Sequence, residues 1–186
     1  TAILAGNALL TMAFEILSSK KLQFSTKIKN ELIQSLANYS GFSGLAAGQY
    51  YDLTFENKKV SKKKIIDIQN KKTGKLFAFC CECIGIIKNQ RYNKRKILKK
   101  IGSDIGLLFQ ITDDLIDYKG DSKTAGKPTR KDKKKGKPTL VNLLGYKKTL
   151  TFAKSLKNKI NKNVKNYGTK SKDLLESIEF ILNRKS

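Results

Sequence analysis

Apolar residues recur three and four positions apart along nearly the whole chain, which is the pattern of amphipathic helices. Strand-like alternation of apolar and polar residues is scarce. The sequence therefore predicts an all-α protein, with helices at about 3–18, 27–56, 62–89, 92–118, 140–165 and 171–184. Ser61 and Ser171 are predicted N-caps of two of these helices. Helices that follow one another so closely favour a bundle.

The chain has 186 residues, the size of a single domain, and we treat 1–186 as one unit. No apolar run reaches the ~18 residues of a membrane-spanning helix, so no integral membrane segment is expected. The opening apolar stretch has no basic residue before it and is interrupted by Asn7 and Glu15. We therefore expect a buried helix there rather than a targeting signal.

The net charge of +24, from 39 basic and 15 acidic residues, suggests an anionic partner. Phosphorylated small molecules and nucleic acid both qualify, although much of this charge is also typical of a solvated surface. Only four basic residues are Arg, the side chain that commonly binds bases through paired hydrogen bonds, so the charge is weak evidence for nucleic acid. Histidine is absent, which excludes imidazole bases and the usual zinc ligands. Three clustered cysteines lack zinc-site spacing and indicate free thiols in a reducing cytoplasm.

The most informative segment is 106–117, GLLFQITDDLID, within a stretch from 101 to 118 that has no Lys or Arg. On a helix, one face of this segment is apolar and the other gathers its polar residues within about 100°. That polar face carries Gly106, Gln110, Asp113, Asp114 and Asp117. Carboxylates one turn apart repel, and a divalent cation removes the repulsion. Mg²⁺, with Mn²⁺ as a substitute, suits such oxygen ligands. The alternative is an ordinary solvated acidic face.

Three further patterns are weaker when each is taken alone. The GQYYD string at 48–52 places Gln49 and Asp52 on one helix face, beside small residues that also suit a tight helix crossing. Lys72-Thr73-Gly74 interrupts a long helix, either as a kink that aims these side chains or as a simple break. The segment 119–138 holds both prolines and the glycine-flanked Lys127 and Lys137. It predicts a mobile basic loop able to close over a diphosphate, or a polar linker.

Taken in order, these strings resemble the trans-isoprenyl diphosphate synthases, the family of farnesyl and geranylgeranyl diphosphate synthases. The matching segments are LAGNALLTMAFEIL (4–17), SGLAAGQYYDL (43–53), NKKTGKLF (70–77), GLLFQITDDLIDYKGD (106–121) and GKPTRKDKKKGKPTLVNLLG (126–145). The resemblance implies an isoprenoid synthase-type helical bundle around a central cavity, normally homodimeric. It also implies a Mg²⁺-dependent short-chain prenyltransferase that joins an allylic diphosphate to isopentenyl diphosphate.

The resemblance also implies roles for individual residues. Asp113 and Asp117 would ligate the metal, with Asp114 close by or as a further ligand. Lys72, Lys127 and Lys137 would hold the diphosphate. Thr73 and Gln110 would orient dipoles. The residues that line or support the pocket would be Phe109, Gly106, Gln49 and Asp52. Arg184 and Lys185 would close over the second substrate.

The family's first aspartate-rich motif does not occur in these 186 residues. We therefore expect the C-terminal portion of a synthase domain without its N-terminal helices, and no appreciable synthase activity from this chain alone. A noncatalytic regulatory subunit of a prenyl synthase is one alternative. A basic helical nucleic-acid-binding protein is the other, although it leaves the Lys-free acidic segment unexplained, so no nucleic acid is expected as a partner.

Overall fold

The computed structural model describes residues 1–120 and 136–184, and within these ranges the chain is helical, with no strand. The all-α prediction is thereby confirmed. The elements, in chain order, are α1 (Ala2–Ser18), α2 (Thr26–Ser40), α3 (Leu45–Thr54), α4 (Lys62–Gln69), the π-helical turn η1 (Asn70–Gly74), α5 (Lys75–Ile87), α6 (Tyr92–Lys119), α9 (Leu140–Leu144), α10 (Tyr146–Lys165), the 3₁₀ turn η2 (Gly168–Ser171) and α11 (Lys172–Asn183).

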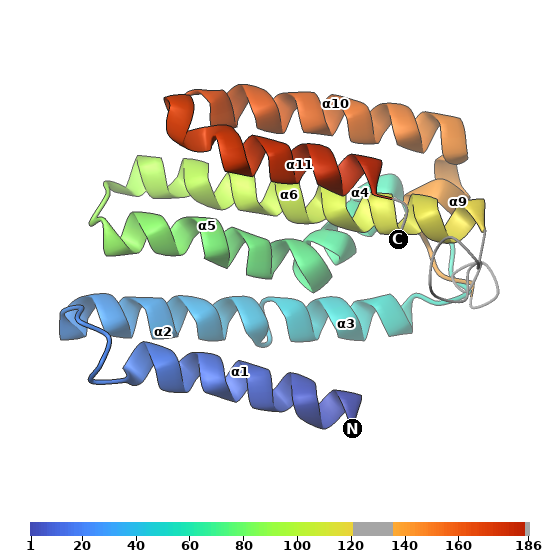
Figure 1. Cartoon of the computed structure of the whole chain (residues 1–186). Helices are drawn as coiled ribbons and strands as arrows, with labels where there is room; N and C mark the ends of the chain where they lie inside the picture. Colours follow the sequence, from blue (N-terminus) through green and yellow to red (C-terminus); the bar gives the residue numbers. More distant parts are fainter. Residues whose placement is uncertain (121–135, 185–186) are drawn as a thin grey trace.

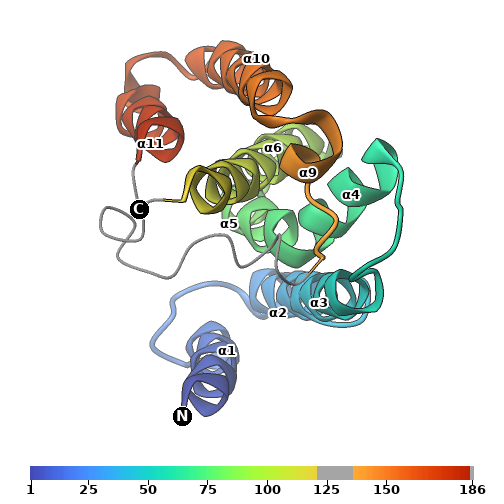
Figure 2. The same cartoon turned by 90° about the vertical axis from the view of Figure 1, so that its right-hand side faces the viewer.

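The helices form layers with nearly aligned axes (Figure 1). At one side α1 lies along α2, and α2 and α3 follow one another end to end. The hairpin of α5 and α6 forms the middle, and α10 and α11 pack on the far side of α6. The end view shows α6 between α5 and the α10–α11 pair (Figure 2). The last helix therefore returns to the end of α6 that carries the aspartates.

The longest helix, α6, provides the centre of the core. It contacts α5, η1, α9, α10 and α11. The apolar residues on one face of its second half are almost fully buried, and they are joined in the core by side chains from α9, α10 and α11: Ile105, Leu108, Ile111 and Leu115 from α6, with Leu140, Val141, Ile160, Val164 and Ile178. Burying this face fixes the rotation of α6, so the opposite, polar face turns toward η1 and α3.

The predicted helix boundaries hold except where glycine intervenes. The expected helix 27–56 is divided between α2 and α3 at the Gly41–Gly44 segment, and the expected helix 140–165 is divided at Gly145, which has φ of +80°. The Ser61 N-cap is confirmed, since its hydroxyl accepts a hydrogen bond from the Lys64 amide. Ser171 occupies the N-cap position of α11, but its hydroxyl donates to the Gly168 carbonyl instead.

The expectation of a buried first helix is wrong for this chain. None of the residues of α1 is buried, and Ile3 and Leu4 are 80% and 72% exposed. The reason is that α1 packs mainly against α2, so most of its apolar surface meets no other described element. No helix in the described ranges combines the length and apolar character that crossing a membrane requires.

Candidate active site

The interruption predicted at Lys72-Thr73-Gly74 is a π-helical turn, not a break, and α4, η1 and α5 run on without a gap. Two glycines allow this turn to sit close to its neighbours. A Cβ on Gly48 of α3 would lie 2.1 Å from the Lys72 amide nitrogen, and one on Gly106 of α6 would lie 2.7 Å from the Gly74 Cα. Only glycine permits such close backbone contact. The turn is therefore held between α3 and α6, and π-helical turns often occur at functional sites.

Lys72 extends from this turn to α3, where its ammonium lies 2.5 Å from a carboxylate oxygen of Asp52. The ammonium of Lys137, which lies just before α9, is 3.5 Å from the same oxygen. All three side chains are mostly shielded from solvent. Two cations from segments far apart in sequence thus share one carboxylate. Each ammonium carries three donors, so the pair can also bind an anion.

Thr73, the next residue, faces α6 and begins a line of hydrogen bonds. Its hydroxyl donates to the side-chain oxygen of Gln110 at 3.0 Å, and the Gln110 amide donates to one oxygen of Asp114 at 2.9 Å. The other Asp114 oxygen accepts from the side-chain amide of Gln69 at 2.6 Å. Asp114 is only 4% exposed. Its carboxylate therefore fixes both amides, and through Gln110 it fixes the orientation of the Thr73 hydroxyl.

Asp113 points to another side of α6, toward the end of the chain. A guanidinium nitrogen of Arg184, just after α11, lies 3.0 Å from one of its oxygens and also donates to the Phe109 carbonyl at 3.2 Å. The guanidinium lies over the Phe109 ring, 3.9 Å from its centroid. The Phe109 ring packs against Phe77 of α5. An aromatic pair and a cation thus border the carboxylates.

The acidic face of α6 offers oxygen ligands for a divalent cation. Asp113 and Asp117 are one turn apart, and both remain partly exposed. The described residues contain no cluster of three or more metal-binding side chains. This donor set suits Mg²⁺, which commonly takes one or two carboxylates and completes its shell with water and phosphate oxygens. Asp114 differs because both of its oxygens accept hydrogen bonds from amides.

The structure thus gathers most of the residues named from the sequence at one end of the bundle, on η1, α3, α6 and the end of α11. Gln49 lies on α3 with Asp52, and its side chain is exposed. Lys127 and Lys185 lie outside the described residues, as does most of the predicted basic loop at 119–138.

Sequence reasoning missed Gln69, which is 7% exposed and holds Asp114 from the last turn of α4. Its side-chain oxygen is buried and has no hydrogen-bond partner among the described atoms. A signal existed in the sequence, because Gln69 follows Ile65 and Ile68 on the apolar face of α4. A polar residue within an apolar face is either satisfied by a partner or positioned for a ligand.

Comparison with known proteins decides the family. Residues 1–178 match the polyprenyl synthetase family. The chain belongs to this family. The farnesyl diphosphate synthase of Escherichia coli K12 is 34% identical over 189 residues, which cover 98% of this chain and 63% of that protein. The farnesyl diphosphate synthase of Micrococcus luteus is 39% identical over 145 residues, covering 78% and 49%.

Solved structures of family members share the fold. A geranyltransferase from Helicobacter pylori, complexed with magnesium and isoprenyl diphosphate, superposes with a TM-score of 0.80 and 31% identity over 98% of this chain. A farnesyl/geranylfarnesyl diphosphate synthase from Zymomonas mobilis gives a TM-score of 0.82 and 37% identity over 97%. The chain covers 59% and 60% of these two proteins. It thus spans about half to three-fifths of the length of its relatives.

Proposed function

We infer that this chain supplies the part of a short-chain prenyl diphosphate synthase that holds the diphosphate of an allylic substrate during its ionisation. The observation that carries this proposal is the meeting of Lys72 and Lys137 at the Asp52 carboxylate. Thr73, next to Lys72, is hydrogen-bonded through Gln110 to Asp114 of α6. A nucleic-acid-binding protein would need neither the shielding of these lysines nor the buried amide network.

The reaction of the family breaks the bond between the allylic carbon and the diphosphate oxygen, which keeps the electron pair. Lys72 and Lys137 would stabilise the negative charge that grows on the diphosphate, because preorganised cations act strongly in a shielded site. The double bond of isopentenyl diphosphate then attacks the allylic cation, and a proton is lost. The oxygens of Thr73 and Gln110, held by Asp114, would orient dipoles toward that cation.

Mg²⁺, when bound, would add compact positive charge at the diphosphate oxygens, and Asp113 and Asp117 would hold it. Mn²⁺ suits the same ligands. Asp114 is predicted close to the metal or as a further ligand, and we infer that it also positions Gln69 and Gln110, because its oxygens accept hydrogen bonds from their amides. Arg184 would keep Asp113 in place before the metal binds, and it is free to turn to the second substrate once metal and diphosphate arrive.

Calorimetric titration of the 186-residue chain with geranyl diphosphate tests this proposal. The part of the binding that depends on Lys72 should require Mg²⁺ and be lost with EDTA. The Lys72→Ala variant should bind at least about tenfold more weakly, because a hydrogen bond between charged groups contributes ~1.5–3 kcal/mol. Lys154→Ala removes an exposed lysine of α10 and serves as the matched control. If EDTA leaves the affinity unchanged, and if Lys72→Ala and Lys154→Ala both bind as tightly as the parent chain, the site does not hold a diphosphate.

Condensation itself needs a second measurement. We expect no appreciable product from residues 1–186 alone, since the first aspartate-rich motif is absent from this sequence. Joining the N-terminal segment of a relative that bears this motif should restore condensation with isopentenyl diphosphate. Full activity of residues 1–186 alone would refute this expectation. Binding without restored condensation would favour a regulatory subunit.

A second copy of this chain is the partner that α1 suggests. Its side chains Ile3, Leu4, Leu9 and Ile16 are more than half exposed, and apolar patches of this kind commonly mark interfaces. A homodimer would cover them. Light scattering should give the dimer mass for the chain and the monomer mass for Leu9→Lys. A monomeric parent chain would contradict this assignment. We also propose a cytoplasmic location, where the thiols of Cys80, Cys81 and Cys83 would stay reduced.

A further inference from the structure

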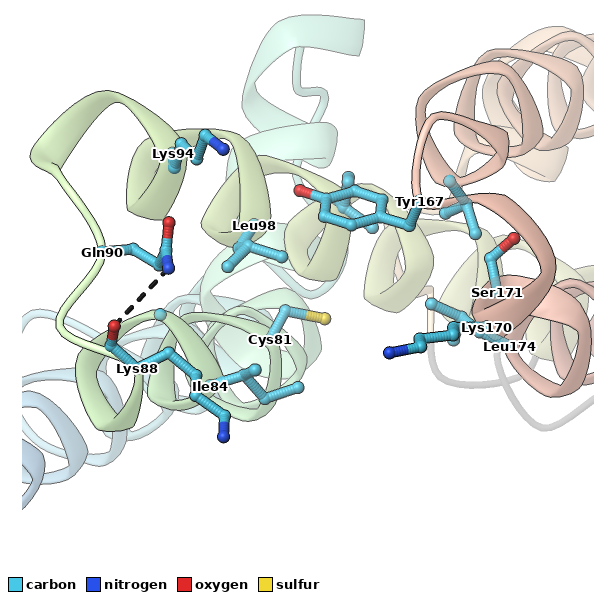
Figure 3. A pocket seen from close by; sticks show the side chains of 13 residues that line it. Cys81, Ile84, Lys88, Gln90, Lys94, Leu98, Tyr167, Lys170, Ser171 and Leu174 are labelled. Carbon is cyan, nitrogen blue, oxygen red and sulfur yellow. Dashed lines mark hydrogen bonds between the residues drawn. The ribbon is translucent and has the colours of Figure 1, made fainter.

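A separate pocket lies at the end of the α5–α6 hairpin away from the candidate active site. Residues of α5, α6, the end of α10, η2 and the start of α11 line it (Figure 3). Its volume is about 470 Å³, within the range of pockets that hold small organic molecules. No residue of the candidate active site lines this pocket. The pocket therefore needs an explanation of its own.

The floor of the pocket is apolar. Ile101 and Val164 are 3% and 1% exposed and form its base, with Leu98 beside them. Ile84 and Leu174 lie at its mouth and remain 55% and 38% exposed. Apolar side chains that stay wet in a concave site favour a ligand that removes water from them. The occupant must therefore carry an apolar chain.

The rim of the pocket is positively charged. Lys88, Lys94 and Lys170 line it, and the described lining residues include neither Asp nor Glu. Figure 3 shows Lys170 and the Cys81 sulfur extending toward one another across the opening. Glu82, adjacent to Cys81, is engaged elsewhere, because its carboxylate accepts the Tyr39 hydroxyl of α2. The occupant must therefore also carry negative charge.

This positive region continues beyond the pocket. Lys94 and Tyr167 also line a second hollow between α6 and α10, together with Lys96, Lys100 and three asparagines. Positive charge thus surrounds the apolar floor at the rim, as expected for a site that takes a chain into the pocket and leaves the headgroup at its edge.

We propose that this pocket binds a single-chain amphiphile with an anionic headgroup, the chain lying on Leu98, Ile101 and Val164 and the headgroup between Lys94 and Lys170. A neutral apolar ligand would leave the lysines unmatched. A small inorganic anion would leave the floor wet. Fatty carboxylates and alkyl or prenyl phosphates share the required chemistry.

A chain-length series measures the apolar part of this site. Hexyl, octyl and decyl phosphate are titrated into the full chain by calorimetry, with inorganic phosphate as the headgroup alone. Each added CH₂ should tighten binding about fourfold, since ~0.8 kcal/mol per buried CH₂ corresponds to that factor. Decanoate compared with decyl phosphate identifies the preferred headgroup, and either preference supports the proposal. Equal affinity across the series, inorganic phosphate included, would overturn it.

Variants locate the site. Lys170→Glu should weaken binding of decyl phosphate about tenfold by charge reversal at the rim. Ile84→Asp, at an exposed position, should do the same by placing a carboxylate at the mouth. Lys154→Glu makes the same charge change as Lys170→Glu on exposed α10 surface outside both hollows and should leave affinity within about twofold. An equal loss for both glutamate variants would show general charge attraction and overturn the proposal.

The two adjacent cysteines give a local readout of where the ligand binds. Cys81 lines the pocket, whereas Cys80 is exposed outside it. Decyl phosphate should slow alkylation of Cys81 and leave Cys80 unchanged, as measured by fragmenting the labelled peptide that contains both. Binding that is abolished by Lys72→Ala without protection of Cys81 would place the amphiphile in the active site and refute the assignment.

Discussion

Asp104 and Asp114 lie on the same helix and are both almost fully buried, yet their neighbours differ in kind. Asp104, toward the start of α6, is bound by the ammonium groups of Lys100 and Lys159 at 2.6 and 3.0 Å. Asp114, toward the end, accepts hydrogen bonds from the amides of Gln69 and Gln110. The lysines are about half exposed, and an ammonium makes little directional demand. The contact of Asp104 with Lys159 therefore fastens α6 to α10, and the contact with Lys100 lies within α6.

The amides at Asp114 do more than hold helices together. When the nitrogen of a side-chain amide donates a hydrogen bond, the direction of the amide oxygen is fixed as well. The Gln110 oxygen accepts a hydrogen bond from the Thr73 hydroxyl. The contact thus passes orientation on to a second group. Asp104 and Asp114 are equally buried, so burial of a carboxylate does not by itself reveal its role. The chemistry of its partners separates a fastening residue from a positioning residue.

The largest effect is expected from removing the charges at the site end of α6. The double variant Asp113→Asn/Asp117→Asn should bind geranyl diphosphate in Mg²⁺ at least about 100-fold more weakly, since each charged contact contributes ~1.5–3 kcal/mol. Calorimetry measures the loss, and circular dichroism checks that the variant is folded. Affinity that stayed near the parent value would remove the metal role from α6.

Breaking the positioning contact should affect both stability and binding. In Asp114→Asn an amide would face the two amide donors, leaving buried groups unpaired, so the free energy of unfolding should fall by about 2–3 kcal/mol. Mg²⁺-dependent diphosphate binding should weaken about tenfold because Thr73 and Gln110 lose their orientation. Urea unfolding and calorimetry measure the two quantities. A stability loss with unchanged binding would reduce Asp114 to a fastening role.

The matched change at the other end should affect stability alone. Asp104→Asn keeps one hydrogen-bond acceptor but removes the charge, and the half-exposed lysines can turn to water. We therefore expect the free energy of unfolding to fall by about 1–2 kcal/mol, with diphosphate affinity within twofold of the parent. Any tenfold loss of affinity in this variant would break the contrast between the two ends.

An effect confined to alkaline pH is expected from the Cys81 thiol of α5. Burial raises the pKa of the Cys81 thiol to about 11, from its usual 9.0. The unfolded thiol ionises first, so the unfolded state binds fewer protons between these values and stability falls as pH rises from about 9 to 11. This thiol contributes at most ~1.4 kcal/mol per pH unit. Cys81→Ala should flatten the alkaline loss measured by urea unfolding, and an unchanged slope would contradict the prediction.

The sequence predicts the helical fold and much of the site because both depend on local spacing. The period of apolar residues gives the helices, and the aspartate spacing places Asp113 and Asp117 on one face. The pairing of Lys72 with Asp52 and of Arg184 with Asp113 joins segments 20 and 71 residues apart. Such contacts depend on how helices pack, which local spacing does not determine. The pairing of Gln69 with Asp114 could not be predicted for the same reason, since the two residues are 45 positions apart.

The π-helical turn at Asn70–Gly74 makes the site sensitive to the length of the chain. A turn of this kind holds one residue more than an α-helical turn, because its hydrogen bonds reach to i+5. Deleting one residue there, such as Lys71, would let α4 and α5 merge into one regular helix with its backbone hydrogen bonds intact. Because the deletion removes the one extra residue of the turn, the side chains of α4 would keep nearly the same rotation relative to α5. The change would fall on the turn itself, so a protein of unchanged helix content would keep Gln69 near Asp114 and alter the presentation of Lys72 and Thr73.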